Sequence, residues 1–411
     1  MPPVAYVVSR FPVASETFIL REINALSDEH GLEVELHVLF RAVRPFVHPD
    51  AERWVERVRR VSPAQGVAGL AWWLRREPVA LIKALGSVLA GYARTPRLLA
   101  RALITFALAA GHARQITDEG AGHVHAHFAT YPALTAWLCR RLTGVGYSIT
   151  AHAHDIFVDQ SHLHTVVSEA DFVVAISEFN RGFLAVYGGD RATPVHVVRC
   201  GLRASVYDFR PRAAPAEGPV RALCVASFEE YKGHGVLLDA LAADPGLARL
   251  ELDLVGAGSL EDELRAHAER LGIAGRVHFL GTRSEGEVAA MLAVADLFVL
   301  PSVVASDGQM EGIPVALMEA LASGVPTVAT RLSGIPELVE DGVTGTLAEP
   351  GDAAAMAAAL RRVIDDPKGT RQLLEAGRER VEHEFAIDTS AAQLAALFAA
   401  PGPAAQRQTA S

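Results

Sequence analysis

The 411-residue chain has only three cysteines, and Cys139, Cys200 and Cys224 are widely spaced. Such a set forms neither a disulfide framework nor a zinc pattern, so we expect a protein of the reducing cytoplasm. The nearest approach to the ~18–20 apolar residues of a membrane-spanning helix is Leu98–Ala113, which Arg101 interrupts. The opening MPPVAYVVSRFP lacks the pattern of a signal peptide. The expected location is therefore cytoplasmic, with peripheral contact on the inner face of the membrane left open.

Basic residues are too few for a uniformly basic nucleic-acid-binding protein, because the chain has 38 basic and 48 acidic residues and a net charge of −10. Residues 41–114 depart from this average. They hold thirteen basic and four acidic residues, so this segment carries +9 and the rest of the chain −19. The segment therefore fits contact with an anionic surface, although an ordinary solvated helical face explains the same charges.

Hydrophobic residues make up 50% of the chain and charged residues 21%, which excludes a disordered or collagen-like protein. Short apolar runs alternate with helical patterns, as in parallel sheets built from βαβ units. Helices are expected at 15–26, with Ser15 as N-cap, and at 132–142. The expected strands are Val4–Val8, Glu33–Phe40, His123–Phe128, Tyr147–His152, Asp171–Ser177, Val195–Gly201, Arg221–Ser227, Leu250–Gly256, Arg276–Gly281, Asp296–Ser302 and Pro326–Thr330.

The pattern divides the chain into two α/β halves of similar size. We expect two doubly wound, Rossmann-like domains facing each other across a deep cleft, because open α/β sheets bind ligands at the carboxyl ends of their strands. The predicted parts are a domain at 1–204 with a basic helical insert at 50–118, a linker at 205–219, a domain at 220–385, a helix at 386–400 that packs back on the first domain, and a tail at 401–411.

The densest motif is DGQMEGIPVALMEALASGVPTVAT, residues 307–330. It predicts a helix over about 314–322, with Pro314 at the first helical position and Gly324 after its end. The free backbone N–H groups and positive dipole of a helix start attract an anion. Glu311 and Glu319 lie at most ~12 Å apart along such a helix. This separation would let them bind the two ends of a sugar–diphosphate–ribose ligand. The alternative is that both are solvated acids on a surface helix.

This E-x7-E segment, followed by GIPELVEDGVTG, resembles the donor site of the retaining group 1 glycosyltransferases, which have the GT-B fold. The resemblance extends through VASFEEYKGHGVLLDAL, VGAGSLEDEL and VHFLG in the second half. In the first half, SRFPVASETFILREI, HAHFATYPA and TAHAHDIF resemble the branch that builds exopolysaccharides and related glycoconjugates. Only residues 50–118 and the tail fall outside the resemblance.

On the donor side, the resemblance implies that Glu319 holds the ribose hydroxyls and that Glu311 contacts the donor sugar. It also implies that the backbone of Gly312, Ile313 and Pro314 approaches the diphosphate. Each carboxylate is suited to these tasks because it accepts hydrogen bonds from hydroxyl groups.

Lys232 matches the family lysine that neutralises the donor phosphates, and it is one of only three lysines in the chain. A surface lysine is the alternative. The family commonly has an arginine five residues earlier, where this chain has Ser227. Arg283 and Arg331 are candidates to replace that cation. The glycines of the strand–G-x-G segment, which fit either diphosphate binding or tight packing, are Gly256 and Gly258.

On the acceptor side, His152 matches the family histidine that faces the donor sugar. A histidine that is simply satisfied at a strand end is the alternative. Further acceptor-side candidates are Ser15, Glu16, His127 and Asp155. The H-x-H pairs, His125 with His127 and His152 with His154, would also suit zinc or iron. The additional acid and histidine of metallohydrolase motifs are missing from HAHDIF, so we expect no metal site.

The sequence therefore predicts a retaining glycosyltransferase that needs no metal or other cofactor. The chain has no D-x-D triplet, which argues against a manganese-dependent GT-A enzyme. The catalytic candidates are His152, Glu311 and Lys232. The expected partners are a nucleotide diphosphate sugar and a saccharide, lipid-linked or small-molecule acceptor, with no nucleic acid. Two alternatives stay open, namely a silent nucleotide-sugar-binding protein and a hydrolase or phosphorylase of the same fold.

Overall fold

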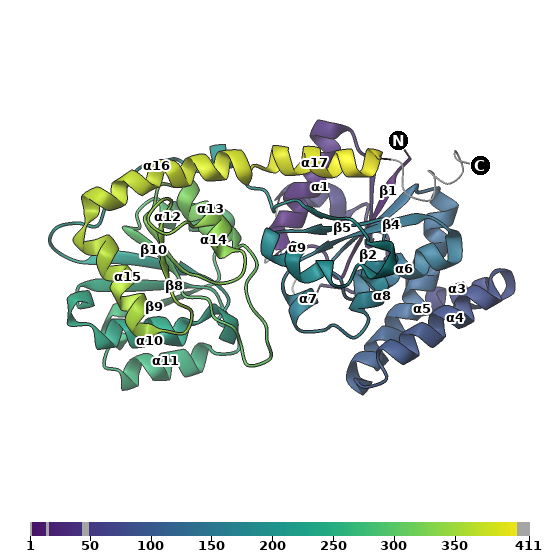
Figure 1. Cartoon of the computed structure of the whole chain (residues 1–411), viewed down its shortest axis with the longest axis horizontal. Coiled ribbons are helices and arrows are strands. Elements are labelled where there is room, and N and C mark those ends of the chain that lie inside the picture. Colours follow the sequence, from purple (N-terminus) through teal and green to yellow (C-terminus); the bar gives the residue numbers. More distant parts are fainter. Residues whose placement is uncertain (1, 14–15, 43–48, 401–411) are drawn as a thin grey trace. The chain divides into compact units, whose positions relative to one another are not determined.

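The computed structural model describes residues 2–13, 16–42 and 49–400, which form two compact units (Figure 1). The first unit contains the described residues up to Gly201 together with the segment that begins at Ser390, and the second extends from Leu202 to Thr389. The expected linker at 205–219 lies in the second unit, and the predicted domain boundaries stay a prediction. Among the described residues, none of the helices combines the length and apolarity needed to cross a membrane.

The first unit is built on a parallel sheet with the strand order β2-β1-β3-β4-β5-β6. Its strands are β1 (Val4–Val8), β2 (Val34–Val38), β3 (His123–His127), β4 (Gly146–Ala151), β5 (Phe172–Ala175) and β6 (Val195–Val197). The chain grows from β1 toward β2 and then returns to extend the sheet from β3 to β6. The order therefore reverses between β1 and β3, and open α/β sheets bind ligands beyond the carboxyl ends of strands at such a point.

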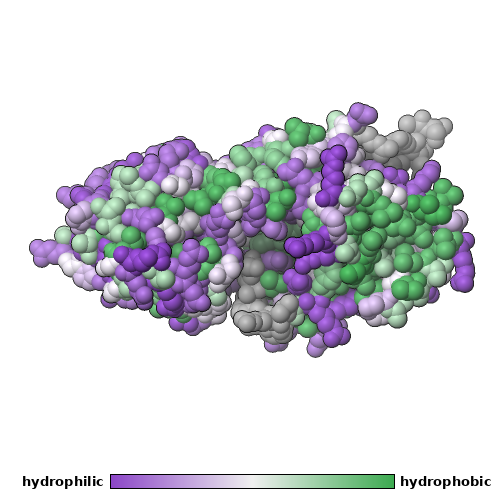
Figure 2. Space-filling view, turned by 90° about the horizontal axis from the view of Figure 1, so that it is seen from below, coloured by the Kyte–Doolittle hydropathy of each residue, from purple (hydrophilic) through white to green (hydrophobic). Residues whose placement is uncertain are grey.

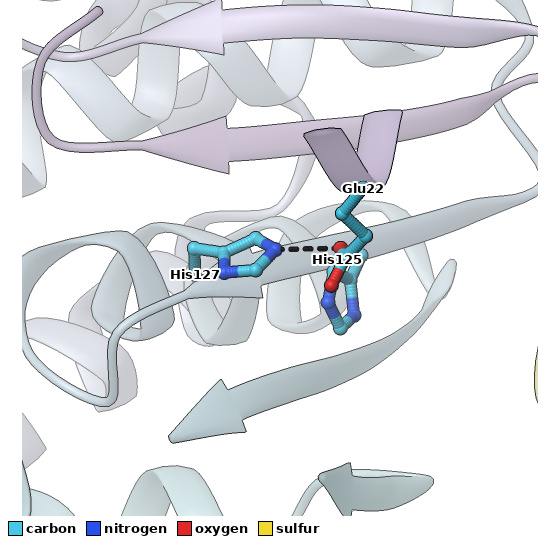
Figure 3. Close-up of side chains that lie close together, drawn as sticks. All are labelled: Glu22, His125 and His127. Carbon is cyan, nitrogen blue, oxygen red and sulfur yellow. Dashed lines mark hydrogen bonds and ion pairs between the residues drawn. The ribbon is translucent and has the colours of Figure 1, made fainter. Parts of the chain in front are cut away.

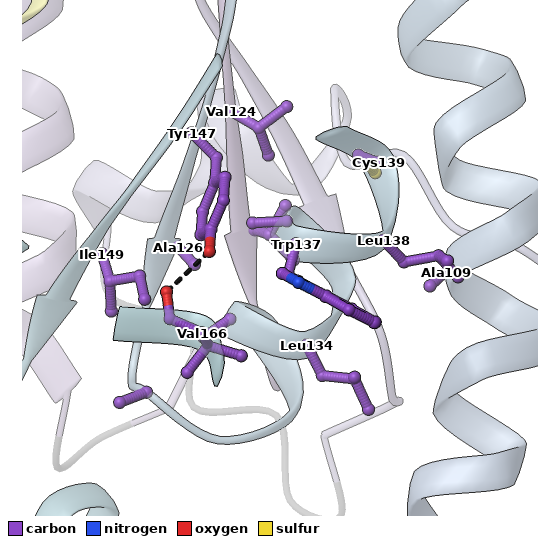
Figure 4. Close-up of a cluster of buried hydrophobic side chains, with 14 of the residues drawn as sticks. Ala109, Val124, Ala126, Leu134, Trp137, Leu138, Cys139, Tyr147, Ile149 and Val166 are labelled. Atoms are coloured by element: carbon purple, nitrogen blue, oxygen red, sulfur yellow. Dashed lines mark hydrogen bonds between the residues drawn. The ribbon is translucent and has the colours of Figure 1, made fainter. Parts of the chain in front are cut away.

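The helices of the first unit pack on this sheet and on one another. They are α1 (Thr17–His30), α2 (Glu52–Val55), α3 (Pro63–Arg76), α4 (Pro78–Gly91), α5 (Pro96–Glu119), α6 (Tyr131–Thr143), α7 (His154–Phe157), α8 (Leu163–Ser168) and α9 (Glu178–Ala185). Trp137 of α6 and Tyr147 of β4 are fully buried in the core between the strands and α5 (Figure 4). Their polar atoms are satisfied, because Tyr147 donates to Val166 O at 2.6 Å and Trp137 donates to Glu169 at 2.9 Å.

Helices α3 to α5, residues 63–119, occupy most of the insert predicted at 50–118, and α3 begins at Pro63 behind a capping box on Ser62. Its helices α3 and α5 touch along a line of small residues. A Cβ added at Gly69 would lie 2.7 Å from Gly111 N, so the two backbones are in direct contact there. The buried Trp73 ring donates from Nε1 to Ala110 O at 3.0 Å, which holds α3 against α5.

The second unit has a parallel sheet in the order β12-β11-β10-β7-β8-β9, which reverses between β7 and β10. Its strands are β7 (Val220–Val225), β8 (Leu250–Val255), β9 (Val277–Gly281), β10 (Leu297–Leu300), β11 (Thr327–Thr330) and β12 (Thr346–Ala348). Its helices are α10 (His234–Ala243), α11 (Glu261–Arg270), α12 (Glu285–Leu292), α13 (Val315–Ala322), α14 (Ile335–Leu338), α15 (Ala353–Asp365) and α16 (Pro367–Glu384), and the last helix, α17 (Ile387–Ala399), ends in the first unit. There Phe398 packs its ring 5.1 Å from the ring of His125.

The predicted strands are all confirmed, with ends that differ by a few residues. Three details differ from expectation. The short strand β12 was missed. Helix α1 continues to His30, beyond the predicted end at Leu26, and stops at Gly31 in the left-handed conformation. Pro314 is the N-cap of α13 in an extended conformation, not its first helical residue. Ser15, expected to cap α1, lies outside the described residues, and Glu16 holds the N-cap position.

Candidate active site

The loops that follow β7 and β10 meet at the point where the strand order of the second unit reverses. A 3-10 turn at Glu230–Lys232 follows β7, and the segment between β10 and α13 contains Glu311. The two loops are joined by backbone and side-chain hydrogen bonds, since Val303 N donates to Tyr231 O at 2.9 Å and Ser306 N donates to Glu230 at 2.9 Å. This junction brings together donor-side candidates that lie far apart in the sequence.

Lys232 and Glu311 form an ion pair at this junction. The two side chains are only 13% and 12% exposed. Burial alone disfavours the Lys232 ammonium, but Glu311, with smaller effects of Tyr231 and Cys224, outweighs burial and raises the pKa of Lys232. Lys232 is therefore a fixed cation beside the start of α13, where the backbone N–H groups of a helix also favour an anion. The adjoining Gly312, Ile313 and Pro314 are buried.

The G-x-G segment after β8 lies against the loop after β7. Gly256 has φ +149°, and a Cβ there would lie 2.0 Å from Ala226 O. A Cβ on Gly258 would lie 2.4 Å from Phe228 O. Both glycines are therefore required for the close packing of the two loops. Their role toward a diphosphate stays a prediction.

Glu319 on α13 is 9% exposed, and its carboxylate accepts a 3.0 Å hydrogen bond from the hydroxyl of Tyr207. Sequence reasoning missed Tyr207, which lies 112 residues earlier and belongs to no motif. The buried phenol orients the Glu319 carboxylate, which is the group predicted to bind the ribose.

The position of the missing family arginine, Ser227, is half-buried. Neither proposed replacement is shown to contact Lys232. Arg331 pairs with Asp341 and Glu349 instead, and Arg283 is exposed. The role of Arg283 and Arg331 as substitutes stays a prediction.

Next to Lys232, the structure shows a buried histidine that sequence reasoning did not select. His234 is 3% exposed, and neither of its ring nitrogens has a hydrogen-bond partner within the described part of the chain. Burial lowers the pKa of His234 to about 4, with the Lys232 charge adding to the effect, so the ring is neutral near pH 7.

In the first unit, His152 is the residue after β4 and is held on three sides. Its backbone N–H donates to Asp155 at 3.0 Å, its carbonyl accepts from Asn180 at 2.6 Å, and its Nε2 lies 3.2 Å from Nδ1 of His127. The ring of His127 in turn contacts Glu22 Oε1 through Nε2 at 2.8 Å. Burial lowers the pKa of His152 well below its usual range, so this imidazole is neutral. Glu22, His127 and His152 therefore form a continuous hydrogen-bonded chain.

The H-x-H residues of β3 form, with Glu22, a cluster whose ligand atoms lie within 4.8 Å of one another (Figure 3). Each ring nitrogen in it already has a partner. His125 bonds Ser148 at 2.8 Å and Thr150 at 3.0 Å, while His127 bonds His152 and Glu22. The cluster is satisfied by hydrogen bonds within the protein, so its geometry requires no ion.

A cavity of about 400 Å³ lies at the reversal point of the first sheet. Its lining comes from the segments that follow β1, β2, β3 and β4, including the first residues of α6 and α7, and from α5. It includes Arg10, Glu16, Arg101, Ile104, Phe128, Tyr131, His154 and Asp155. Two of the predicted acceptor-side residues, Glu16 and Asp155, therefore line one cavity, whereas His127 does not. The residues that sequence reasoning missed here include Arg101, although its position inside an apolar run was a visible signal.

The two cavity carboxylates differ in their contacts. Both oxygens of Asp155 serve the backbone, since they accept from Ala129 N at 2.6 Å and from His152 N at 3.0 Å. Asp155 thus joins the ends of β3 and β4. Glu16 Oε2 is buried without a hydrogen-bond partner among the described residues, and burial raises the pKa of Glu16 to about 7. Glu16 is therefore the cavity carboxylate whose hydrogen-bonding capacity the described residues leave unused.

Comparisons with known proteins agree with these two units. Residues 207–380 match the family model described as "Glycosyl transferases group 1". The chain is 32% identical to a protein of Escherichia coli K12 named for colanic acid biosynthesis, the glycosyltransferase WcaL, over 97% of this chain and 99% of that protein. It is 29% identical to the amylovoran biosynthesis glycosyltransferase AmsK of Erwinia amylovora, over 96% and 98% of the two chains.

Solved structures show the fold. The crystal structure of Anabaena HepE in complex with UDP-glucose matches with a TM-score of 0.70 at 19% identity, covering 97% of this chain and 100% of that one. Sucrose-phosphate synthase from Thermosynechococcus elongatus matches with a TM-score of 0.71 at 20% identity over both full chains. The prediction of a two-domain α/β chain of the GT-B class is confirmed.

Proposed function

The chain belongs to the group 1 glycosyltransferases, and from this premise we propose that it is a retaining, metal-independent member of them. It moves a sugar from a nucleotide diphosphate sugar to a hydroxyl of a saccharide, lipid-linked or small-molecule acceptor. Relatives named for colanic acid and amylovoran biosynthesis support a role in making an exopolysaccharide or a related glycoconjugate. The UDP-glucose complex of HepE supports a nucleotide sugar as donor.

The single observation that supports this proposal best is the Lys232–Glu311 pair at the reversal point of the second sheet. A donor diphosphate placed there meets the Lys232 ammonium and the half-buried first residues of α13, Val315 and Ala316. A buried cation and a helix start that exist before the reaction stabilise the charge that develops on a leaving diphosphate. Glu311, released from Lys232 by the incoming phosphates, is then able to accept hydrogen bonds from the donor sugar.

The other donor-side and sugar-side roles follow the same logic. Glu319, oriented by Tyr207, accepts from the ribose hydroxyls. His152 is neutral, so its ring both donates and accepts, and it hydrogen-bonds the transferred sugar without adding a fixed charge. Asp155 and His127 act through His152 by holding its backbone and its ring.

Retention follows if the acceptor hydroxyl attacks the anomeric carbon from the face that the diphosphate leaves. The bond from the anomeric carbon to the phosphate oxygen breaks as the bond to the acceptor oxygen forms. The departing phosphate oxygen takes the acceptor proton, so no separate protein base is required. Lys232 and the helix start supply the positive charge that a metal ion supplies in other transferases, which supports metal independence.

The experiment that tests the proposal begins with thermal shifts of the purified chain in UDP-, GDP-, ADP- and dTDP-sugars, with and without EDTA. We expect one nucleotide series to raise the melting temperature, because a ligand that binds only the folded state stabilises it. Proton NMR of the product formed from the stabilising donor then gives its anomeric configuration. Inversion of configuration, or activity that EDTA abolishes and added metal restores, would contradict the corresponding part of the proposal.

The same assays separate the two alternative functions. Donor consumption in the absence of acceptor at the full rate would identify a hydrolase, and phosphate-dependent release of sugar 1-phosphate a phosphorylase. Nucleotide-sugar binding by calorimetry without turnover on any acceptor hydroxyl would identify a silent binding protein.

A further inference from the structure

The helical insert exposes a continuous set of large apolar side chains. Figure 2 shows hydrophobic residues gathered over the part of the first unit that contains α3, α4 and α5. We call this set the α3–α5 face. Its members are between 37% and 63% exposed and are Val67, Leu74, Val79, Ile82, Leu89, Leu103 and Ile104. Scattered single apolar residues are normal on a protein surface, whereas a gathered patch of this kind marks an interaction site.

Helix α4 shows most clearly that this face is built to be covered. Its inner stripe of Leu81, Ala84 and Val88 is buried against the rest of the unit. Its outer side repeats the pattern with Val79, Ile82 and Leu89, which are 63%, 62% and 43% exposed. A helix that is apolar on both sides is stable in water only when both sides are covered. The inner side packs within the protein, so we expect the outer side to contact another molecule or surface.

The charges around the face indicate what that cover is. Between residues 63 and 114 the chain has seven basic residues and a single acid, Glu77. Five of the basic side chains are exposed and form no ion pair with another described residue, namely Arg75, Arg76, Lys83, Arg94 and Arg97. The Arg76 guanidinium also lies 4.3 Å from the ring centre of Trp72. Apolar side chains ringed by cations and an aromatic residue complement an anionic bilayer, where the apolar groups enter the acyl boundary and the cations meet phosphate.

The α3–α5 face is continuous with the acceptor-side cavity. Ile104, which is 58% exposed on α5, belongs to the face and also lines the cavity of about 400 Å³. One turn earlier on the same helix, Arg101 lines that cavity too. A ligand anchored in a membrane under the face would therefore meet a cation and an apolar side chain at the cavity edge before it reached Glu16.

We propose that the α3–α5 face binds the surface of an anionic lipid bilayer, so that the adjoining cavity receives the polar end of an acceptor anchored in that bilayer. The proposed bilayer contact is inferred from the exposed side chains and charges alone. The proposed binding of a membrane-anchored acceptor in the cavity also depends on the proposed glycosyl transfer.

The test is flotation of the full chain with vesicles of phosphatidylcholine alone or mixed with phosphatidylglycerol, without donor or acceptor. Wild-type protein floats with the anionic vesicles, remains behind with the neutral ones, and dissociates as salt is raised, because salt screens the charges. Two variants examine the two components, V79D/I82D for the apolar side chains and R75E/K83E for the cations. Each lowers the anionic vesicle-bound fraction about tenfold or more.

Matched controls come from exposed positions of the second unit. Val294, which is 54% exposed, gives V294D, and the exposed cations of α16 give K368E/R371E. Both controls float as the wild type does. The proposal is overturned if the wild type does not bind anionic vesicles or if the controls lose binding as far as the face variants do. It is equally overturned if light scattering shows that the face holds two copies of the chain together and V79D/I82D only separates them.

Donor-binding measurements distinguish failure of the proposed bilayer contact from failure of the proposed transferase function. The face variants retain the wild-type thermal shift with the stabilising nucleotide sugar, which also shows that they are folded. Suppose that the protein binds vesicles but no nucleotide sugar shifts its melting temperature. The bilayer contact would then be supported, whereas the proposed transferase function and the proposed membrane-anchored acceptor would both be contradicted. A donor response without vesicle binding would do the reverse.

Discussion

Lys232 and Glu311 lie 79 residues apart in the sequence and form an ion pair at the reversal point of the second sheet. Each is proposed to bind a different part of the donor, and the ion pair engages the binding group of both. The pair therefore keeps two buried charges compensated until the donor replaces it, because an unpaired charge at such a site is costly.

Replacing either member should disable transfer, and the fold should survive at lower stability because the remaining charge loses its partner. We expect Lys232→Ala and Glu311→Ala each to lower kcat/KM about 10²–10³-fold, the usual effect of removing one preorganised charge that stabilises a transition state. Initial-rate assays with the stabilising donor measure this. Lys368→Ala, at an exposed lysine of α16, is the matched control and keeps the wild-type rate. Wild-type rates in either pair variant would refute the assignment of the donor site.

The chain from Glu22 through His127 to His152 predicts an effect at a distance. Glu22→Gln keeps the size of the side chain but removes the charge that faces His127 Nε2 at 2.8 Å, so His127 no longer holds His152 in one orientation. We expect kcat to fall about tenfold with little change in the KM for the donor, as for a positioning residue that loses one hydrogen bond to a charged group. Glu33→Gln, at an exposed glutamate, is the control. A rise in KM at constant kcat would instead show that Glu22 serves binding.

The sequence was sufficient for the fold because parallel strands buried on both sides appear as continuous apolar runs. Val4–Val8 is buried at every position and was predicted with its correct ends. The strand β12 was missed because Thr346–Ala348 is three residues long and lies in no apolar run, whereas the equally short β6 lies in the run VHVV. The outer side of α4 was not foreseen either. A helix with apolar residues on two sides gives no sign in its sequence of which side the protein covers.

The candidate site was predictable only where a motif exists. Lys232 and Glu311 were selected from the resemblance, but their mutual contact depends on the strand order, which brings the loops after β7 and β10 together. Tyr207 has no motif and meets Glu319 only through tertiary packing. The altered pKa of Glu16 likewise has no sequence signal, because it arises from burial in the folded protein.

Glu16 should make stability depend on pH. Its pKa is about 7 in the folded protein and near 4.5 in the unfolded chain, so the folded state binds the proton more tightly. Stability therefore falls as pH rises from about 4.5 to about 7 and then levels off. Glu16→Gln lacks this loss, so we expect the variant to gain about 1–3 kcal/mol relative to wild type between pH 5 and pH 8. Urea unfolding at the two pH values measures it, and the titration of other groups cancels in the comparison. A constant difference between the two proteins would place Glu16 in contact with solvent.

The contact between α3 and α5 predicts opposite effects for two glycine-to-alanine substitutions in the insert. A Cβ at Gly69 would lie 2.7 Å from Gly111 N and 2.8 Å from Ala110 O, both backbone atoms that move only if the helices separate. We therefore expect Gly69→Ala to lower the free energy of unfolding by about 1–3 kcal/mol. At Gly86 on the outer side of α4 a Cβ meets nothing within 4 Å, so Gly86→Ala should raise it by about 0.5–1 kcal/mol through helix propensity alone. Thermal and urea unfolding of the two variants beside wild type decide the matter. Equal effects of the two substitutions would mean that α3 and α5 are not in backbone contact, and the α3–α5 face would then lack the rigid support that presents it.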